Sequence, residues 1–372
     1  MKKLVLLITL VSVSLAGFTQ SGKRTAPVND GIETGTMAAV NIDSVRIHQM
    51  AGEIQKGNFP NIHSVLIARH NKLVFEKYWP GKDEKWGNDI GVIEHGANDL
   101  HDIRSISKSI VSACVGIAIS QGKIKSVDQK VFEFFPEFAK YDTGWKSMLT
   151  LQHLLSMTSG LTWNEDVPYD NPENSEIRMI NSPNPMEYVL SRPMDFEPGK
   201  MWKYNGGTTQ LLAAIMQKVS CKSIDQFAAT YLFQPLGITQ FEWVKFPGKD
   251  LPAAASGLRL RSRDLLKFGL LYNNGGVWKG KQVVPAAWVN DSFKSHVTTA
   301  FGGYGYQFWL FDDKVNDTTV RIVAAVGNGD QRIFFDKKSD RVVVITAGNY
   351  NKWNMPRNSA AIMREYIAPA TK

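Results

Sequence analysis

The chain has 372 residues, of which 43% are apolar and 21% charged, and its formal net charge at pH 7 is +8. This composition is typical of a globular protein and argues against a disordered chain, a collagen or a membrane protein with many spans. The length suits two domains, or one large domain with an insertion. Two cysteines are too few for a disulfide scaffold or a cysteine-based zinc site.

Residues 1–16 have the pattern of a bacterial secretory signal peptide. Two lysines precede an apolar run over residues 4–17, and Ser14 and Ala16 are the small residues expected at positions −3 and −1 of a cleavage site. The apolar run is shorter than the about 20 residues that span a bilayer, so we expect an exported, periplasmic or secreted protein without a membrane anchor. Residues 17–40 are polar and mixed, and we expect a linker there.

Hydrophobic patterning predicts the main elements in chain order. Two β-branched runs predict a hairpin over 64–79 with its turn at 70–72, followed by a charged loop over 80–98. Dense apolar runs predict helices over 106–119, 151–157, 208–219 and 264–272. Prolines among Asn and Asp predict a long loop over 163–186. Strand-like runs near the end cover 321–326, 331–335 and 341–347.

Strands at both ends with helices between them predict an α+β fold. We expect the early hairpin and the late strands to share one antiparallel sheet flanked by helices, formed by residues 41–104 and 256–372. Residues 105–255 would form an inserted, mainly helical domain. A cleft between the two parts is where a site is expected.

The spread of charge and the cysteines limit the possible partners. No clustered basic stripe with aromatic residues indicates nucleic-acid binding. Arg259, Arg261 and Arg263 alternate with other residues, and we expect them on a solvated face. Cys114 lies in an apolar run and Cys221 in a polar turn, and we expect no disulfide between them. Nothing in the sequence indicates a metal, an organic cofactor or an obligate protein partner.

The Ser-x-x-Lys pattern is the most useful chemical signal. It occurs at Ser105 to Lys108 and again at Ser120 to Lys123, about as often as chance allows. Ser120 stands at the end of a predicted helix, so Lys123 would not share a face with it. Ser105 stands where that helix begins, and Lys108 faces the same way about one turn later.

A helix start can assist a nucleophilic serine. Its unpaired N–H groups favour an alkoxide-like Ser105 and a developing oxyanion. Lys108 lies at the edge of an apolar face, and the loss of solvation favours a neutral amine that can take the serine proton. The alternative is a serine N-cap followed by a solvated lysine, and this segment alone leaves both interpretations open.

Further motifs make the sequence resemble the serine β-lactamase-like hydrolases, in the branch of class C β-lactamases, D-Ala-D-Ala carboxypeptidases, EstB-type esterases and 6-aminohexanoate-dimer hydrolases. The motifs occur in the family's order over about 60–350, as Ile103 to Ser109, His153 to Leu161, Glu197-Pro198-Gly199, Tyr204-Asn205-Gly206, Pro235-Leu236-Gly237, Ser256-Gly257-Leu258 and Tyr304-Gly305-Tyr306. The resemblance implies a β-lactamase/transpeptidase-like fold and a small-molecule ester or amide substrate that is cleaved through an acyl-enzyme.

The resemblance also implies roles for individual residues. Ser105 matches the nucleophile, Lys108 its partner, and Tyr204 the tyrosine that acts with the lysine in moving protons. A tyrosine near an ammonium is pushed toward phenolate, and a phenolate is a competent base. Gly327 aligns with the family glycine on a late strand, so the N–H groups of Ser105 and Asn328 would form the oxyanion hole.

Two departures from the family pattern bear on the substrate. Gly206 stands where the Tyr-x-Asn motif has Asn, and the Lys-Thr-Gly motif is missing around Gly327. We expect both glycines to contact the substrate. The departures weigh against penicillins and D-Ala-D-Ala termini and favour small esters or linear amides. A β-lactamase or D-Ala-D-Ala carboxypeptidase is the alternative enzyme. A sensor that is acylated without turnover is the alternative from another class.

Other side chains near these motifs are weaker candidates. Trp163, Tyr169 and Trp309 would line the cleft, or else belong to the core or a lid. Glu165 could be compared with the deacylating base of class A β-lactamases. The surrounding pattern is not theirs, so we expect a solvated loop carboxylate.

Overall fold

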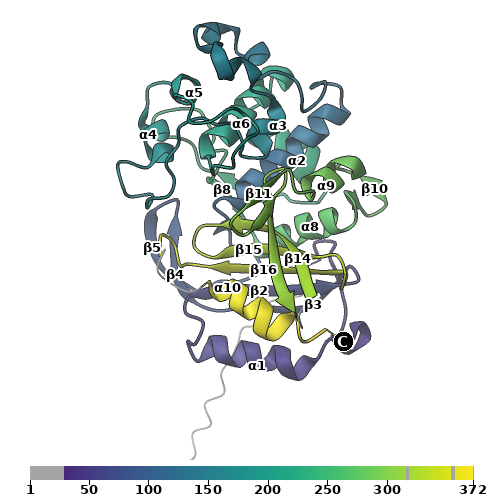
Figure 1. Cartoon of the computed structure of the whole chain (residues 1–372). Helices are drawn as coiled ribbons and strands as arrows, with labels where there is room; N and C mark the ends of the chain where they lie inside the picture. Colours follow the sequence, from purple (N-terminus) through teal and green to yellow (C-terminus); the bar gives the residue numbers. More distant parts are fainter. Residues whose placement is uncertain (1–28, 316–317, 353–356, 372) are drawn as a thin grey trace, which may run out of the picture. The chain divides into compact units, whose positions relative to one another are not determined.

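The computed structural model describes residues 29–315, 318–352 and 357–371 (Figure 1). The expected signal peptide, 1–16, lies outside the described residues. From Gly31 onward the described chain forms one compact unit. Among these residues, no helix combines the length and the apolar character that crossing a membrane requires.

A nine-stranded sheet forms the centre of the α+β fold. Its strand order is β1-β3-β2-β16-β15-β14-β13-β12-β11. The strands are β1 (Glu33–Thr34), β2 (Ile62–Arg69), β3 (Lys72–Tyr78), β11 (Val297–Thr299), β12 (Gly302–Tyr304), β13 (Trp309–Val315), β14 (Thr318–Gly327), β15 (Gln331–Asp336) and β16 (Arg341–Ala347). All neighbours are antiparallel except β1, which runs parallel to β3. The expected pairing of the early hairpin with the late strands is confirmed, through β2 and β16.

The early hairpin shows why this sheet forms. His70 and Asn71 have φ angles of 52° and 61°, as a two-residue turn that follows the twist of the strands requires. Along β2, Val65 and Ile67 join one apolar cluster whereas Leu66 joins another. Because successive side chains point to opposite faces, β2 is buried on both sides and the sheet needs a helical layer on each.

Helices supply both layers. The helices α1 (Ser44–Gln55) and α10 (Asn358–Ile362), with the turn Met363–Ile367, share one apolar cluster with the sheet, and Figure 1 shows α1 and α10 side by side on it. The helices α2 (Ile106–Ser120) and α8 (Ser262–Asn273) belong to the cluster on the opposite face. Asp43 caps α1, because its side chain accepts hydrogen bonds from the first turn.

The middle of the chain is mainly helical and packs around α2 and α6. Its helices are α3 (Leu151–Leu155), α4 (Ser175–Asn181), α5 (Pro185–Ser191), α6 (Gly206–Ser220) and α7 (Ile224–Ala228), and α9 (Ala286–Ser292) follows later. Shorter helical turns cover Ala38–Val40, Val131–Phe134, Pro136–Tyr141, Gly144–Met148 and Ala229–Phe233. A small sheet has the order β6-β8-β7, with β6 (His101–Asp102), β7 (Glu242–Trp243) and β8 (Leu258–Leu260). Two hairpins remain, β4 (Gly81–Lys85) with β5 (Asn88–Ile93), and β9 (Val277–Trp278) with β10 (Lys281–Gln282).

The predicted helices are found with ends shifted by a few residues, but two predicted loops contain regular structure. The charged segment 80–98 forms the β4–β5 hairpin, which the sequence hides because most of its side chains are at the surface and no apolar alternation is needed. The segment 163–186 contains α4, whose first turn is capped by the Asn174 side chain. The helix α1 was not predicted.

The three arginines that we expected on a solvated face are buried instead. Arg259, Arg261 and Arg263 are 8%, 8% and 4% exposed. Arg259 pairs with Asp102 at 2.7 Å, Arg261 makes two bonds to Asp264 at 2.6 and 3.0 Å, and Arg263 pairs with a glutamate of β3 at 2.6 Å. The expectation was wrong because each arginine is buried against a carboxylate partner. The spacing of the arginines along the chain does not show which carboxylates will lie next to them.

The two cysteines lie in different surroundings. Cys114 is buried inside α2 and Cys221 is exposed at the end of α6, and both are free thiols, as predicted. Burial raises the pKa of the Cys114 thiol.

Candidate active site

Ser105 lies at the start of α2, shortly after β6, and its side chain makes no capping bond to the helix. Instead, Lys108 Nζ lies 3.1 Å from Ser105 Oγ and also donates to the Ala255 carbonyl oxygen at 2.9 Å. Lys108 is 1% exposed. A capping serine with a solvated lysine is therefore not what forms here. The serine hydroxyl is free to serve as a nucleophile and has a buried amine beside it.

Tyr204 completes this group. Lys108 Nζ lies 4.9 Å from the centre of the Tyr204 ring, and the nearby Ser105 side chain acts to lower the pKa of Tyr204. Burial, and next the Glu165 carboxylate, raise the pKa of Tyr204 well above its ordinary value. The phenolate expected from the sequence is therefore not the resting form, because burial and the neighbouring carboxylate raise the pKa of Tyr204 by more than Ser105 lowers it.

A pair of buried carboxyl groups, Glu165 and Glu176, lies next to these three side chains. The two residues are 5% and 2% exposed. Glu165 accepts hydrogen bonds from Trp163 Nε1 and from the Tyr169 hydroxyl, and Glu176 accepts one from Ser256 Oγ at 2.8 Å. Burial, followed by the charge of Glu165, raises the pKa of Glu176 to about 7. Glu176 therefore holds a proton below neutral pH.

The carboxyl pair was not predicted from the sequence. Glu165 was expected to be a solvated loop carboxylate, which was wrong, and Glu176 was not considered. A Cβ atom at Gly206 would lie 2.6 Å from Glu176 Oε2 and 2.8 Å from Glu165 Oε1, and the Gly206 N–H donates to Glu165. The carboxyl groups thus fill the space that a side chain at position 206 would need. The glycine at position 206, where the family motif has Asn, was the one sequence signal that could have indicated these buried carboxyl groups.

The turn at Gly327 and Asn328, which was predicted to supply an oxyanion donor, lies close to the residues that precede Ser105. Gly327 ends β14, and a Cβ atom there would overlap the Ile103 carbonyl oxygen. Asn328 follows, and its side chain both donates to Asn351 Oδ1 at 2.7 Å and accepts from the Asn351 N–H at 2.9 Å. These bonds fix the turn beside the residues that lead to Ser105. The use of the Ser105 and Asn328 N–H groups as an oxyanion hole stays a prediction.

The three aromatic candidates occupy different places. Trp163 is 2% exposed, and its indole N–H is bound to Glu165, so its contribution is to packing. Tyr169 donates to the same carboxylate at 3.0 Å. Trp309 stacks on Tyr204 with ring centres 5.8 Å apart and an angle of 28° between the planes. Trp309 therefore contacts the group around the nucleophile directly.

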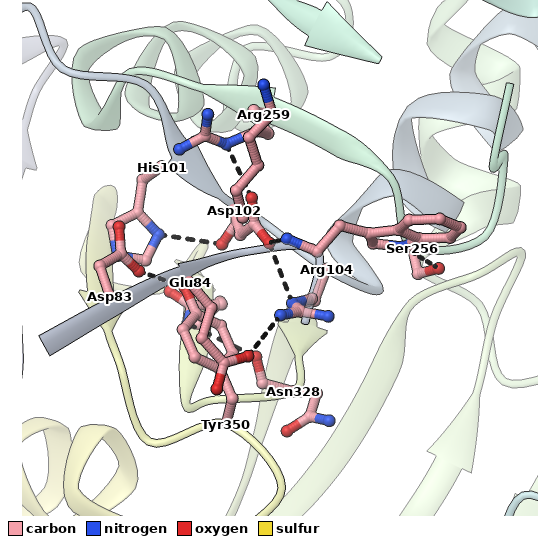
Figure 2. Close-up of polar contacts among 12 residues, drawn as sticks. Asp83, Glu84, His101, Asp102, Arg104, Ser256, Arg259, Asn328 and Tyr350 are labelled. Carbon is pink, nitrogen blue, oxygen red and sulfur yellow. Dashed lines mark hydrogen bonds and ion pairs between the residues drawn. The ribbon is translucent and has the colours of Figure 1, made fainter. Parts of the chain in front are cut away.

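Arg104, the residue before the nucleophile, has a φ of 48°, in the left-handed region. Such a conformation costs on the order of 1–3 kcal/mol and is retained only when the surroundings enforce it. Arg104 pairs with Glu84 at 3.0 Å and with Asp102 at 3.3 Å, and its guanidinium lies 4.5 Å from the centre of the Tyr350 ring (Figure 2). This network holds the turn that presents the serine at the start of α2.

Comparisons with known proteins agree with this fold and this arrangement. The family model named Beta-lactamase matches residues 52–365, and the chain belongs to that family. It is a serine hydrolase of the β-lactamase-like kind, as the resemblance implied.

Relatives within the family have several activities. The 6-aminohexanoate-dimer hydrolase of Paenarthrobacter ureafaciens is 26% identical over 299 residues, which cover 75% of this chain and 70% of that protein. A beta-lactamase of Escherichia coli strain K12 is 27% identical over 160 residues, 43% of this chain and 39% of that one. The structure of EstCE1, described as a hydrolase with promiscuous acyltransferase activity, matches with a TM-score of 0.67 at 17% identity, over 89% of this chain and 99% of that chain. This last likeness shows the fold.

Proposed function

We propose that this chain cleaves ester or linear amide bonds by forming an acyl-enzyme on Ser105, with Lys108 and Tyr204 moving the protons. The observation that carries the proposal is the position of Lys108 Nζ, which lies 3.1 Å from Ser105 Oγ and 4.9 Å from the centre of the Tyr204 ring. The group lies at the N-terminus of a buried helix, where partial positive charge favours a developing oxyanion.

In the acylation step, Ser105 Oγ attacks the carbonyl carbon while its proton passes to Lys108 in its neutral form. Tyr204, which holds its proton at rest, gives it to the leaving alkoxide or amine and regains one from Lys108. The bond between the carbonyl carbon and the leaving group breaks, and an ester remains on Ser105. Two N–H donors, from Ser105 and Asn328, would hold the oxyanion, and one such donor typically contributes about 3 kcal/mol.

Deacylation uses the same groups in reverse. A water molecule gives its proton to the Lys108–Tyr204 pair and attacks the ester, and Ser105 regains its proton as the acid leaves. When Lys108 is protonated, its charge lowers the pKa of Glu176. The same attraction stabilises the ammonium that forms on Lys108 during acylation, so the buried carboxyl pair supports proton transfer to the amine.

The substrate proposal rests on what the site lacks and on one relative. Gly206 brings no amide side chain to the site, and a carboxyl pair lies where that side chain would be. A negative charge there disfavours a carboxylate-bearing penicillin or peptide terminus. One relative is named for the hydrolysis of the 6-aminohexanoate dimer. The alternative, a β-lactamase or D-Ala-D-Ala carboxypeptidase, is kept because a beta-lactamase is also among the relatives.

We also propose that the protein is exported to the periplasm or secreted. The support is the pattern of residues 1–16, with two lysines, an apolar run and small residues before the cleavage point. Comparing the N-terminal residue of the protein from whole cells and from the periplasmic fraction tests this. An intact N-terminus in the cytoplasmic fraction alone would contradict it.

Steady-state hydrolysis of a short p-nitrophenyl ester and of a linear amide tests the activity. We expect turnover that is lost in Ser105→Ala and kept in Ser120→Ala, the matched change at the other Ser-x-x-Lys, where Ser120 Oγ bonds the Ile117 carbonyl. Faster turnover of a penicillin or of a D-Ala-D-Ala peptide would favour the alternative enzyme. A persistent acyl adduct without turnover would favour the sensor.

A further inference from the structure

Four side chains with metal-ligand atoms meet beside the strand that leads to the nucleophile. They are His63 of β2, Asp83 of β4, His95 after β5 and His101 of β6, and one ligand atom from each lies within 4.8 Å of the others. His63, Asp83 and His101 are 0%, 1% and 2% exposed. Figure 2 shows Asp83 and His101 next to the ion-pair network of Arg104. The hydrolase activity uses none of the four.

Hydrogen bonds fix which nitrogen carries the proton in the two buried rings. His101 Nδ1 lies 2.9 Å from the Asp102 carbonyl oxygen, which only accepts, so Nδ1 is protonated and Nε2 has the lone pair. The Asn61 amide nitrogen donates to the Lys82 carbonyl at 3.0 Å, which turns Asn61 Oδ1 toward His63 Nε2 at 3.1 Å. His63 therefore carries its proton on Nε2, and its lone pair is on Nδ1.

These assignments make two lone pairs face each other, because His63 Nδ1 and His101 Nε2 are 2.8 Å apart. Two acceptors at that distance need a proton or a cation between them. Two nitrogens bound to tetrahedral zinc lie about 3.3 Å apart, so a small outward movement would make room for the ion.

Two further atoms of the cluster lack partners. Asp83 Oδ2 and His95 Nε2 are buried, and neither has a hydrogen-bond partner in the described part of the chain. The other oxygen, Asp83 Oδ1, lies 3.7 Å from His101 Nε2 and accepts a hydrogen bond from the Tyr350 hydroxyl at 2.8 Å. Hydrogen bonds from outer residues commonly orient metal ligands. The Tyr350 hydroxyl makes such a bond to Asp83, as Asn61 does to His63 and the Asp102 carbonyl does to His101.

The backbone around His63 is shaped to hold the ring. A Cβ atom at Gly81 would lie 2.5 Å from His63 Nε2, and one at Gly348 would lie 2.6 Å from His63 Cε1. These close approaches fix the ring where its Nδ1 faces the cluster. A cavity of about 320 Å³ borders the cluster on the side of Asp83, because its lining includes Asp83 and Tyr350.

We propose that His63, Asp83, His95 and His101 bind one zinc ion. Three imidazole nitrogens and one carboxylate oxygen suit tetrahedral zinc, and four protein ligands make a closed, structural site. The ion would join β2, β4 and β6 and thereby hold the strand that turns through Arg104 to the nucleophile. No metal was expected from the sequence, because these ligands follow no known spacing and only the fold brings them together.

The test is a metal titration of the purified protein without a histidine tag, after removal of metal with a chelator. We expect one zinc per chain, a higher Tm on loading, and the visible absorption of a tetrahedral site with Co²⁺. Asp83→Asn should weaken zinc binding by more than the roughly 10–100-fold that the loss of an outer contact costs, and Tyr350→Phe by about that factor. His48→Gln, an exposed histidine on α1, is the control and should bind as the unchanged protein does.

The metal measurements stand apart from the hydrolase assays. No stoichiometric zinc or Co²⁺ binding by the unchanged protein, with circular dichroism showing a folded chain, would overturn the proposal. Equal affinity in Asp83→Asn and His48→Gln would overturn it as well, because the ion would then bind elsewhere. Both results are read on folded protein, and the titration of the unchanged chain decides the matter even where a variant fails to fold.

Discussion

Replacing Glu176 with Gln tests the buried carboxyl pair. In the folded chain the pKa of Glu176 is raised to about 7, whereas the ordinary value that applies to the unfolded chain is 4.5. Between these pH values the folded state binds more protons than the unfolded state, so the free energy of unfolding falls as the pH rises. The pKa difference corresponds to about 3 kcal/mol at about 1.4 kcal/mol per unit. This stability is fully present below pH 4.5 and is lost as the pH passes the folded value.

The glutamine keeps the shape of Glu176, but it does not titrate. Between about pH 4.5 and about pH 8 the unchanged protein should lose about 3 kcal/mol of unfolding free energy that Glu176→Gln does not lose. The variant should therefore be more stable relative to the unchanged protein at the higher pH by that amount. Urea unfolding at the two pH values measures it. Glu173→Gln removes the same charge at an exposed position of the same loop and should show no such shift. A Glu176→Gln difference that is equal at both pH values would refute the raised pKa of Glu176.

Tyr204→Phe should lower kcat about 10²–10⁴-fold, the usual loss for an acid–base group, and an unchanged kcat would remove Tyr204 from the relay. Gly206→Ala puts a methyl group 2.6 Å from a buried carboxyl oxygen, and we expect a loss of about 1–3 kcal/mol in urea unfolding. Gly52→Ala, on α1 with no atom within 4 Å of the new Cβ, should instead gain about 0.5–1 kcal/mol, and equal effects would contradict the account. A thiol reagent should label Cys221 in the native protein and Cys114 only after unfolding, and two fast thiols in the native protein would show that α2 is not tightly packed.

Elements with a strong apolar pattern could be predicted from the sequence. The strands β2, β15 and β16 and the helix α2 are buried along most of their length, so each contains a run of apolar residues. The β4–β5 hairpin lies at the surface with charged side chains, and no apolar face marks it. The helix α1 buries one narrow stripe, which is a weaker pattern.

The candidate site also contains residues that the sequence predicts and residues that it does not. Ser105 and Lys108 are neighbours on one helix, so their contact follows from spacing. Glu165 and Glu176 are buried because the segment that carries them, which includes α4, folds against Gly206, and that contact joins distant parts of the chain. Their raised proton affinity depends on that burial, so no local pattern in the sequence predicts it.

The central claim, an acyl-enzyme on Ser105, is tested most directly by mass spectrometry of the protein quenched during turnover of a p-nitrophenyl ester. The account predicts an added mass equal to the acyl group, located on the peptide that contains Ser105, and its absence in Ser105→Ala. Turnover that proceeds with no adduct on that peptide, or with the acyl group on another residue, would contradict it.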